Sequence, residues 1–245
     1  MNISAIIKNV FFWFLKEFKQ DGSYLVPLRV FLGIGWVRAS IEKIEDPIWS
    51  EKNGKLKNLL EENINNGIAF NFYEEFLIEI VIPNIEIWAN IIIVGQALCG
   101  VSLILGAFTN LGLLGAMFMN FNFILIGAVN PSVFYIIVQL VLLISNNGHI
   151  FGLDKWISMY LRTSYIVAHI DNTKYWRKNE RWGYSIGALS FLIVSIMSFP
   201  KIESFDAHSV DDPAMILFIL GTLCASCLII GILRLESIDL KKDLE

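Results

Sequence analysis

Long apolar stretches separated by short charged blocks constrain this chain more than any other feature of its sequence. A bilayer core of about 30 Å is crossed by roughly 20 helical residues, and these stretches have lengths close to that. Only 17% of the 245 residues are charged, whereas an average soluble domain has about 25%. We therefore predict an all-α, polytopic membrane protein. Its six expected spans are residues 24–44, 86–107, 111–128, 131–147, 183–199 and 213–233.

The spacing of the spans predicts two membrane units. Short turns at Thr109-Asn110 and Asn130-Pro131 join the second, third and fourth spans, so these helices should be antiparallel neighbours in a tight bundle. The last two spans form a separate hairpin. The expected organisation is an interfacial amphipathic helix at 1–23, a four-helix unit at 24–156 with a loop at 45–85, a basic linker at 157–182, and a transmembrane hairpin with a short tail at 183–245.

The distribution of Lys and Arg predicts the orientation in the membrane. With the N-terminus inside, twelve of these residues lie on the inner side and four on the outer side, and Lys43 lies at the border. Because cytoplasmic loops carry the excess of positive charge, we expect both termini to be cytoplasmic, in a bacterial-type inner membrane. The 45–85 loop is then outside, where two amphipathic segments predict surface helices able to act as a lid.

The sequence argues against several classes of function. A net charge of −4, with no basic run interleaved with aromatics, gives no reason to expect nucleic-acid binding. His149, His169 and His208 lie in polar connections far apart in sequence, so we expect no metal site and no haem ligation. Cys224 and Cys227 share a helix face, but no cation or helix N-terminus near them would stabilise a thiolate, which favours packing over redox chemistry.

Polar side chains recur inside the expected spans, where each is costly unless it is paired or lines a cavity. In the first span, Arg38 and Glu42 are four residues apart and predict an ion pair that faces the bundle interior. Arg29, on the opposite face, is expected to extend to the inner surface. Amides and a phenol occur at similar depth in the next three spans. The predicted pocket, open to the outer half of the bilayer, comprises Arg38, Glu42, Gln96, Asn120, Asn122, Tyr135 and Gln139.

Two interpretations of these polar residues remain open. Buried amides often serve only as interhelical hydrogen bonds, worth about 0.6 kcal/mol each in membranes. Alternatively, the residues line a pocket that holds a headgroup or a small anion. Arg38 would then supply a planar set of donors, and the amides would supply directional hydrogen bonds.

Three stretches of the chain resemble the DoxX/DoxD family. They are VPLRVFLGIGWVRASIEKIEDPIW, GQALCGVSLILGAFTNLGLLGAMFMNFNFILIGAVNPSVFYIIVQLVLL and FGLDKW. The resemblance covers about residues 24–156 and rests on PLR, WVRASIEK, the NFNF asparagines and the NPS turn. It implies a four-helix membrane unit like the membrane subunit of thiosulfate:quinone oxidoreductase, with quinone as the expected cofactor and none bound covalently. The chain departs from the family pattern at Gln96 and Asn110, where a glutamate and a basic residue are common.

Two functions follow from these patterns. The first is a membrane subunit of a quinone-linked oxidoreductase that binds a quinone headgroup or a small sulfur anion in the pocket. The second is a non-catalytic scaffold or assembly subunit, whose hairpin at 183–233 contacts other membrane subunits through small residues such as Gly183, Gly187 and Gly221. The aligned polar groups favour the first function, and the lack of a metal or flavin motif favours the second.

Overall fold

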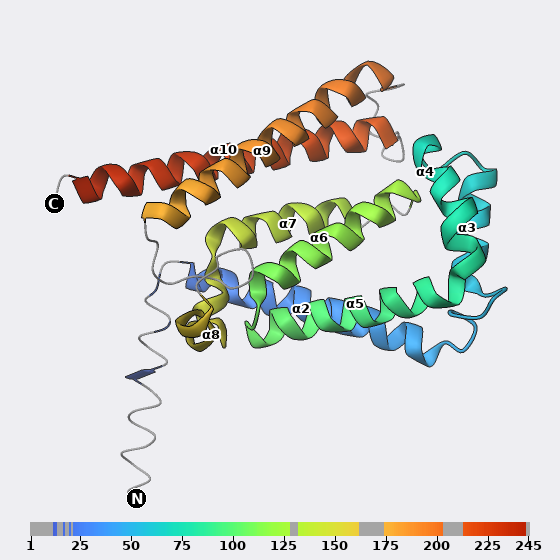
Figure 1. Cartoon of the computed structure of the whole chain (residues 1–245), viewed down its shortest axis with the longest axis horizontal. Coiled ribbons are helices and arrows are strands. Elements are labelled where there is room, and N and C mark those ends of the chain that lie inside the picture. Colours follow the sequence, from blue (N-terminus) through green and yellow to red (C-terminus); the bar gives the residue numbers. More distant parts are fainter. Residues whose placement is uncertain are drawn as a thin grey trace, which may run out of the picture.

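The computed structural model of the protein describes residues 12–13, 17, 20, 22–127, 132–161, 174–202 and 213–243. Every regular element in these ranges is a helix, so the described part of the chain is all-α as predicted (Figure 1). Most of the interfacial helix expected at 1–23 lies outside the described residues, as do residues 162–173 of the expected basic linker.

Helices α2 (Val26–Glu45) and α5 (Ile85–Leu105) pack along each other and overlap the first two expected spans. Glycines allow this close contact, because a Cβ atom on Gly33 would lie 2.8 Å from the carbonyl oxygen of Gly100. A Cβ on Gly100 would likewise lie 2.7 Å from the carbonyl oxygen of Gly33. The two backbones therefore touch, as is common where helices associate in lipid.

Helices α6 (Thr109–Leu125) and α7 (Ser132–Ser145) complete a group of four, with α5 against α6 and α6 against α7 (Figure 1). Their shared core is apolar and includes a tryptophan from α2. Its buried members are Leu32, Trp36, Cys99, Leu103, Leu113, Ala116 and Leu142. The four-helix unit is thus held together by one continuous cluster that all four helices supply.

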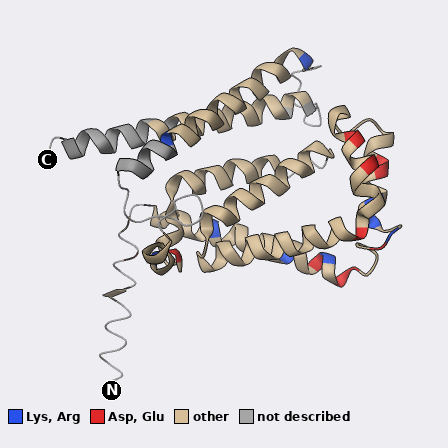
Figure 2. Cartoon of the chain, in the orientation of Figure 1, with Lys and Arg blue, Asp and Glu red and all other residues tan. Residues whose placement is uncertain are grey.

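The loop expected at 45–85 folds into an end cap, which we define as residues 55–84. It contains α3 (Lys55–Asn65), α4 (Asn71–Phe76), a π-helical segment (Leu77–Val81) and a 3-10 turn (Ile82–Asn84). Only α3 is a separate surface helix, because the second amphipathic segment continues into α5 as one helical run from Asn71 to Leu105. Asp and Glu residues gather at this end of the molecule (Figure 2).

The end cap is attached to the end of α6 by three hydrogen bonds. The Asn63 amide donates to the carbonyl of Ile126 at 2.7 Å, and the Tyr73 hydroxyl donates to Asn122 Oδ1 at 2.5 Å. The Phe70 N–H donates to the carbonyl of Leu125 at 3.0 Å. A separate apolar cluster, which includes Leu56 and Leu60 of α3, fills the space beneath.

Helices α9 (Lys174–Ser198) and α10 (Pro213–Asp243) pack along each other as a helix pair. A Cβ on Gly221 would lie 2.6 Å from the carbonyl oxygen of Phe191, so the helices cross at a glycine. Ser195 Oγ lies 2.8 Å from Thr222 Oγ1 and therefore bonds across the helix pair. The helix pair also packs on α7, through a cluster that includes Ile136 and Leu228.

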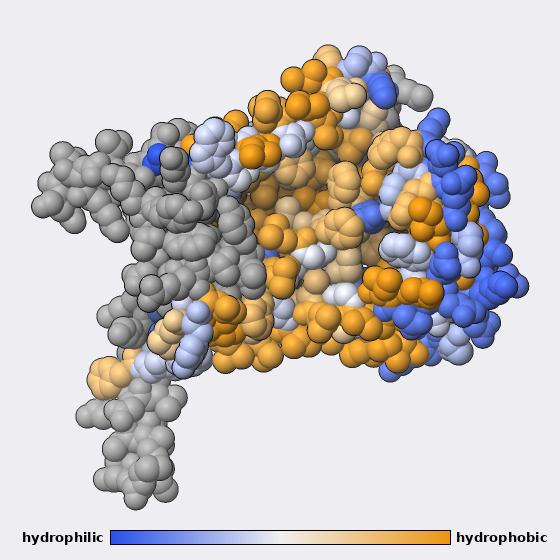
Figure 3. Space-filling model, viewed as in Figure 1, coloured by the Kyte–Doolittle hydropathy of each residue, from blue (hydrophilic) through white to orange (hydrophobic). Residues whose placement is uncertain are grey.

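Three helical runs are long and apolar enough, by length and composition, to cross a membrane: Ser23–Glu45, Asn71–Leu105 and Arg181–Lys201. Thr109–Leu125, Ser132–Ser145 and Leu217–Ile229 are shorter apolar helices. A broad apolar surface covers the middle of the molecule, beside the polar end formed by the cap (Figure 3). Soluble monomers rarely expose apolar patches of this extent, which supports insertion into a membrane.

Candidate functional site

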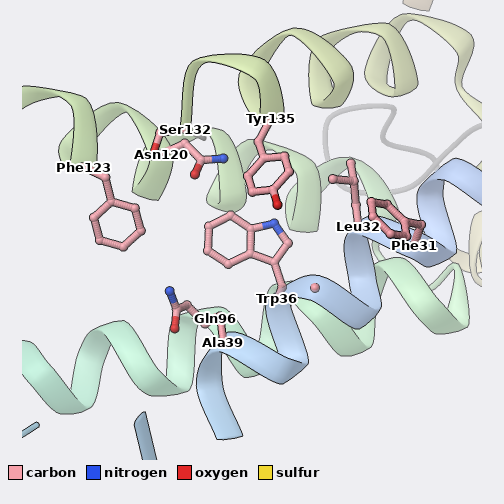
Figure 4. Close-up of a pocket in the computed structure, with 10 residues that line it drawn as sticks. Phe31, Leu32, Trp36, Ala39, Gln96, Asn120, Phe123, Ser132 and Tyr135 are labelled. Atoms are coloured by element: carbon pink, nitrogen blue, oxygen red, sulfur yellow. The ribbon is translucent and has the colours of Figure 1, made fainter. Parts of the chain in front are cut away.

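A cavity of about 280 Å³ lies among α2, α5, α6 and α7 (Figure 4). Each of the four helices contributes at least one polar or aromatic side chain to its wall. The side chains that matter for its chemistry are Trp36, Gln96, Asn120, Phe123, Ser132 and Tyr135. These residues lie near the middle of α2 and α5, late in α6 and early in α7, so they share one depth in the bundle.

The amides of the cavity are buried but incompletely hydrogen bonded. Gln96 is 2% exposed, and its Oε1 has no hydrogen-bond partner among the described residues. Asn120 Nδ2 donates to Gln139 Oε1 at 3.2 Å, while Gln139 Nε2 has no partner in the same part of the chain. Because a buried polar atom without a partner costs about 1–3 kcal/mol, these amides are suited to a bound polar group.

Aromatic rings line the cavity beside the amides. Trp36 of α2 and Tyr135 of α7 point toward one another across it, and Phe123 of α6 stands on the far side (Figure 4). Rings in these positions can pack against a flat ligand, and the Tyr135 hydroxyl can donate or accept a hydrogen bond.

The structure places three of the predicted site residues in the cavity wall and one directly behind it. Gln96, Asn120 and Tyr135 line the cavity, and Gln139 reaches it through its hydrogen bond to Asn120. Asn122 is instead engaged with the end cap and with the carbonyl of Phe118. It lies two positions from Asn120, about 200° around the helix, and therefore faces another direction.

The prediction that Arg38 and Glu42 face the bundle interior is wrong. The two side chains do pair, at 2.7 Å, but they are 79% and 59% exposed. Arg38 follows Trp36 by two positions, so about 200° of helix rotation directs it away from the cavity. Both residues lie in the last turns of α2, where a paired charge can reach the end of the helix instead of the core.

Replacing Arg38 by leucine should therefore lower the free energy of unfolding by less than about 1 kcal/mol, because exposed ion pairs contribute little. Replacing Glu42 by leucine should have a similarly small effect, and so should the double substitution. Unfolding of each purified variant in mixed micelles measures this. A large loss in each single variant that is recovered in the double variant would indicate a buried pair.

Trp36 and Ser132 line the cavity although neither belongs to the predicted site. Serine in an apolar helix bonds readily to its own backbone and so gives no sequence signal. Trp36 did carry one. Tryptophan is enriched at membrane interfaces, and its position in the middle of a span indicated contact with protein or ligand.

A second polar cluster lies at the opposite end of the bundle from the cap. Arg29 is fully buried and donates hydrogen bonds to the carbonyl oxygens of Asn147, at 2.7 Å, and Ile150, at 3.3 Å. The expectation that Arg29 extends to the membrane surface is therefore wrong, because the 147–150 turn supplies it with acceptors inside the protein. We call Arg29, Asn147, Ile150 and Asp154 the Arg29 cluster.

Asp154 is also fully buried and connects this cluster to the start of α6. Its carboxylate accepts the backbone N–H groups of Phe108, at 2.6 Å, and Thr109, at 3.0 Å. Phe108 occupies the N-cap position of α6 and has no side chain that could cap the helix, so Asp154 serves as the cap from a distant part of the chain. The carboxylate also stabilises the charge of Arg29.

Neighbouring side chains complete the electrostatics of the Arg29 cluster. Lys155 pairs with buried Glu17 at 2.5 Å. Burial lowers the pKa of His149 below its ordinary value and so favours the neutral ring. The cluster joins the 147–154 segment to α2 and α6 by hydrogen bonds, so its role is to hold these parts of the protein together.

Residues with metal-binding or thiol chemistry do not converge in the described ranges. No group of three or more His, Cys, Asp or Glu side chains there could hold a metal ion. Cys224 and Cys227 are free thiols in α10, and Cys224 is fully buried in the cluster between the helix pair and α7. The cavity is thus the site best suited to bind a ligand.

Comparisons of the chain with protein-family models, curated proteins and solved structures found no match. The resemblance to the DoxX/DoxD family therefore stays a prediction.

Proposed function

We propose that this protein spans the membrane six times and binds the neutral headgroup of a quinone in the cavity among α2, α5, α6 and α7, as a membrane subunit of a quinone-linked oxidoreductase. One observation carries the proposal. Two buried amides, Gln96 and Asn120, line a small cavity that aromatic rings also line, and Gln96 Oε1 has no hydrogen-bond partner among the described residues. The DoxX/DoxD resemblance points to the same ligand class.

Charge distinguishes a quinone from a small sulfur anion. The ten residues that line the cavity, all in the described part of the chain, include no charged side chain. Arg38, the cation that was expected to bind an anion, is exposed and paired with Glu42. A buried anion requires a compensating charge or several strong donors. A neutral headgroup is therefore the better match.

Amides suit both redox states of a quinone. An amide NH₂ can donate to the carbonyl oxygen of the oxidised ring, and an amide oxygen can accept from the hydroxyl of the reduced ring. The unpartnered Oε1 of Gln96 is such an acceptor. The headgroup plane would pack between Trp36 and Tyr135. The protein would thus bind and orient the quinone, and electrons would come from a partner subunit.

Six crossings with both termini cytoplasmic fit the antiparallel order of the helices. The acidic end cap would then lie outside, as the distribution of Lys and Arg predicts. The 17 residues of α6 span about 25 Å and the 14 residues of α7 about 21 Å, less than the hydrocarbon core. These two helices would require local thinning of the bilayer or flanking residues that extend the span.

A scaffold subunit remains the second candidate function, on the basis of the outer face of α9. Trp182, Ile186, Leu189 and Ile196 are exposed there and could face a partner helix as well as lipid. Two of the small residues expected to contact that partner instead pack against other parts of the same chain. Gly221 lies at the crossing with α9, and Gly187 lies against Leu228.

Replacing Gln96 by leucine should weaken quinone binding by about tenfold, the equivalent of one well-formed hydrogen bond in a buried site. Asn120→Leu should have an effect of similar size. The measurement is the dissociation constant of a short-chain benzoquinone for the protein in lipid nanodiscs, by titration calorimetry. Asn90→Leu is the matched control, since Asn90 is an exposed amide on the same helix as Gln96 and donates to the carbonyl of Glu86 within that helix.

Failure of the wild-type protein to bind either a benzoquinone or a naphthoquinone would overturn the proposed function. Binding that Gln96→Leu and Asn120→Leu leave unchanged would place the ligand elsewhere in the protein.

A further inference from the structure

The cavity reaches the surface of the bundle on the side of α2. Five of its ten lining residues belong to α2, and two of them, Phe31 and Gly35, are exposed. Phe31 is 62% exposed. A Cβ atom on Gly35 would have no neighbour within 4 Å. Gly35 thus lines the cavity and is also exposed at the surface of the protein.

Helix α7 forms the opposite edge of this opening. Ser132 and Tyr135 line the cavity from α7, while α2 packs mainly on α5 and α7 packs mainly on α6 and the helix pair. The surface beside the opening is apolar on both helices: Phe31 and Ile34 are exposed on α2, and Phe134 is exposed on α7. In a membrane these side chains would face acyl chains.

The two ends of the bundle are less open than its side. At one end, the end cap is hydrogen bonded to Asn122, Leu125 and Ile126 of the α6 terminus. At the other, the Arg29 cluster joins α2 to the 147–150 turn. A Cβ on Gly106, which has a φ of 59°, would lie 2.7 Å from the carbonyl oxygen of Gly148, so backbone segments are in contact there.

We infer that the cavity is loaded sideways from the bilayer, through a portal between α2 and α7 at Phe31 and Gly35, and that its ligand is a long-tailed lipid whose apolar tail stays in the portal while its neutral headgroup reaches Gln96. The inference rests on the proposed function, since it assumes that the cavity binds a headgroup. It adds the route of entry and the requirement for a tail.

Gly35→Trp is the direct test, because the new side chain would enter open space at the portal. Gly183→Trp is the matched control: Gly183 is likewise exposed on a helix, and a Cβ there would have no neighbour within 4 Å. Binding of an isoprenoid-tailed quinone and of its tailless analogue is measured in nanodiscs. Wild type should bind the tailed form more tightly. Gly35→Trp should weaken binding of the tailed form by about tenfold or more, and Gly183→Trp should leave it unchanged.

Gly35→Cys keeps the test independent of folding, because the portal can be blocked after the protein has folded. The affinity of the unmodified Gly35→Cys variant for the tailed quinone is measured first and is the reference for the modified protein. After reaction with a bulky maleimide the variant should lose that binding, and bound tailed quinone should slow the reaction. Gly183→Cys, modified in the same way, should retain binding.

The outcomes separate the portal from the proposed function. Absence of all quinone binding in wild type would overturn both. Headgroup binding in wild type that is equal for tailed and tailless forms and unaffected by either change at Gly35 would overturn the portal alone.

Discussion

Replacing Asp154 by alanine should lower the free energy of unfolding by about 2–6 kcal/mol, because two backbone N–H groups would each lose their acceptor, at about 1–3 kcal/mol per group. The carboxylate is fully buried, accepts two backbone N–H groups at the start of α6 and stabilises the charge of Arg29. Its removal would leave the first turn of α6 without a cap and Arg29 without its countercharge. Unfolding in mixed micelles, together with the amount of protein in the membrane, measures the loss.

A second substitution tests the origin of this effect. If Asp154 acts through Arg29, then Arg29→Met combined with Asp154→Ala should cost less than the sum of the two single changes, because the uncompensated charge is gone. Glu61→Ala is the control for loss of a carboxylate, since Glu61 is half exposed and lies 3.6 Å from Lys57. It should change stability by no more than about 0.5 kcal/mol. Additive losses at Arg29 and Asp154 would contradict the coupling.

The helices were the predictable part of this fold. Apolar stretches of suitable length mark α2, α5, α6 and α7, and the spacing of charges marks the loop that folds into α3. Gln96, Asn120 and Tyr135 were also predictable, because amide and phenol groups in apolar helices are costly in lipid and therefore face a cavity or another helix. Their similar depths along the three helices predicted that they lie close together.

Rotation about the helix axis was harder to predict, and the errors at Arg38 and Glu42 follow from it. The depth of a residue in the bundle depends only on its position along the helix. The direction of its side chain, toward the core or away from it, depends on which helices pack on which side. Trp36 and Arg38 differ by two positions and lie on different sides of α2. In the bilayer, hydrophobicity does not mark the inner face as it does in a soluble helix, since both faces are apolar.

Long-range contacts account for the error at Arg29. Its partners are the carbonyl oxygens of Asn147 and Ile150, more than one hundred residues away in the chain. Main-chain acceptors are present at every residue and give no sequence signal. The role of Asp154 as a cap for α6 was hidden for the same reason, because the helix it caps begins 45 residues earlier.

The pocket and the portal both depend on helices that cross the bilayer with the end cap on the outer side. Single cysteines at exposed sites test this directly: Asn53→Cys lies before α3, Tyr160→Cys follows α7, and Lys201→Cys follows α9. A membrane-impermeant maleimide is applied to intact cells and, separately, to permeabilised cells. The chain with only its native Cys99, Cys224 and Cys227 sets the background.

In intact cells, Asn53→Cys and Lys201→Cys should react, and Tyr160→Cys, at a site that is 87% exposed, should react only after permeabilisation. This pattern requires an odd number of crossings between Asn53 and Tyr160, as α5, α6 and α7 would supply, and a further crossing by α9. Reaction of all three sites in intact cells would contradict the six crossings. Reaction of Tyr160→Cys alone would reverse the orientation and place the end cap in the cytoplasm.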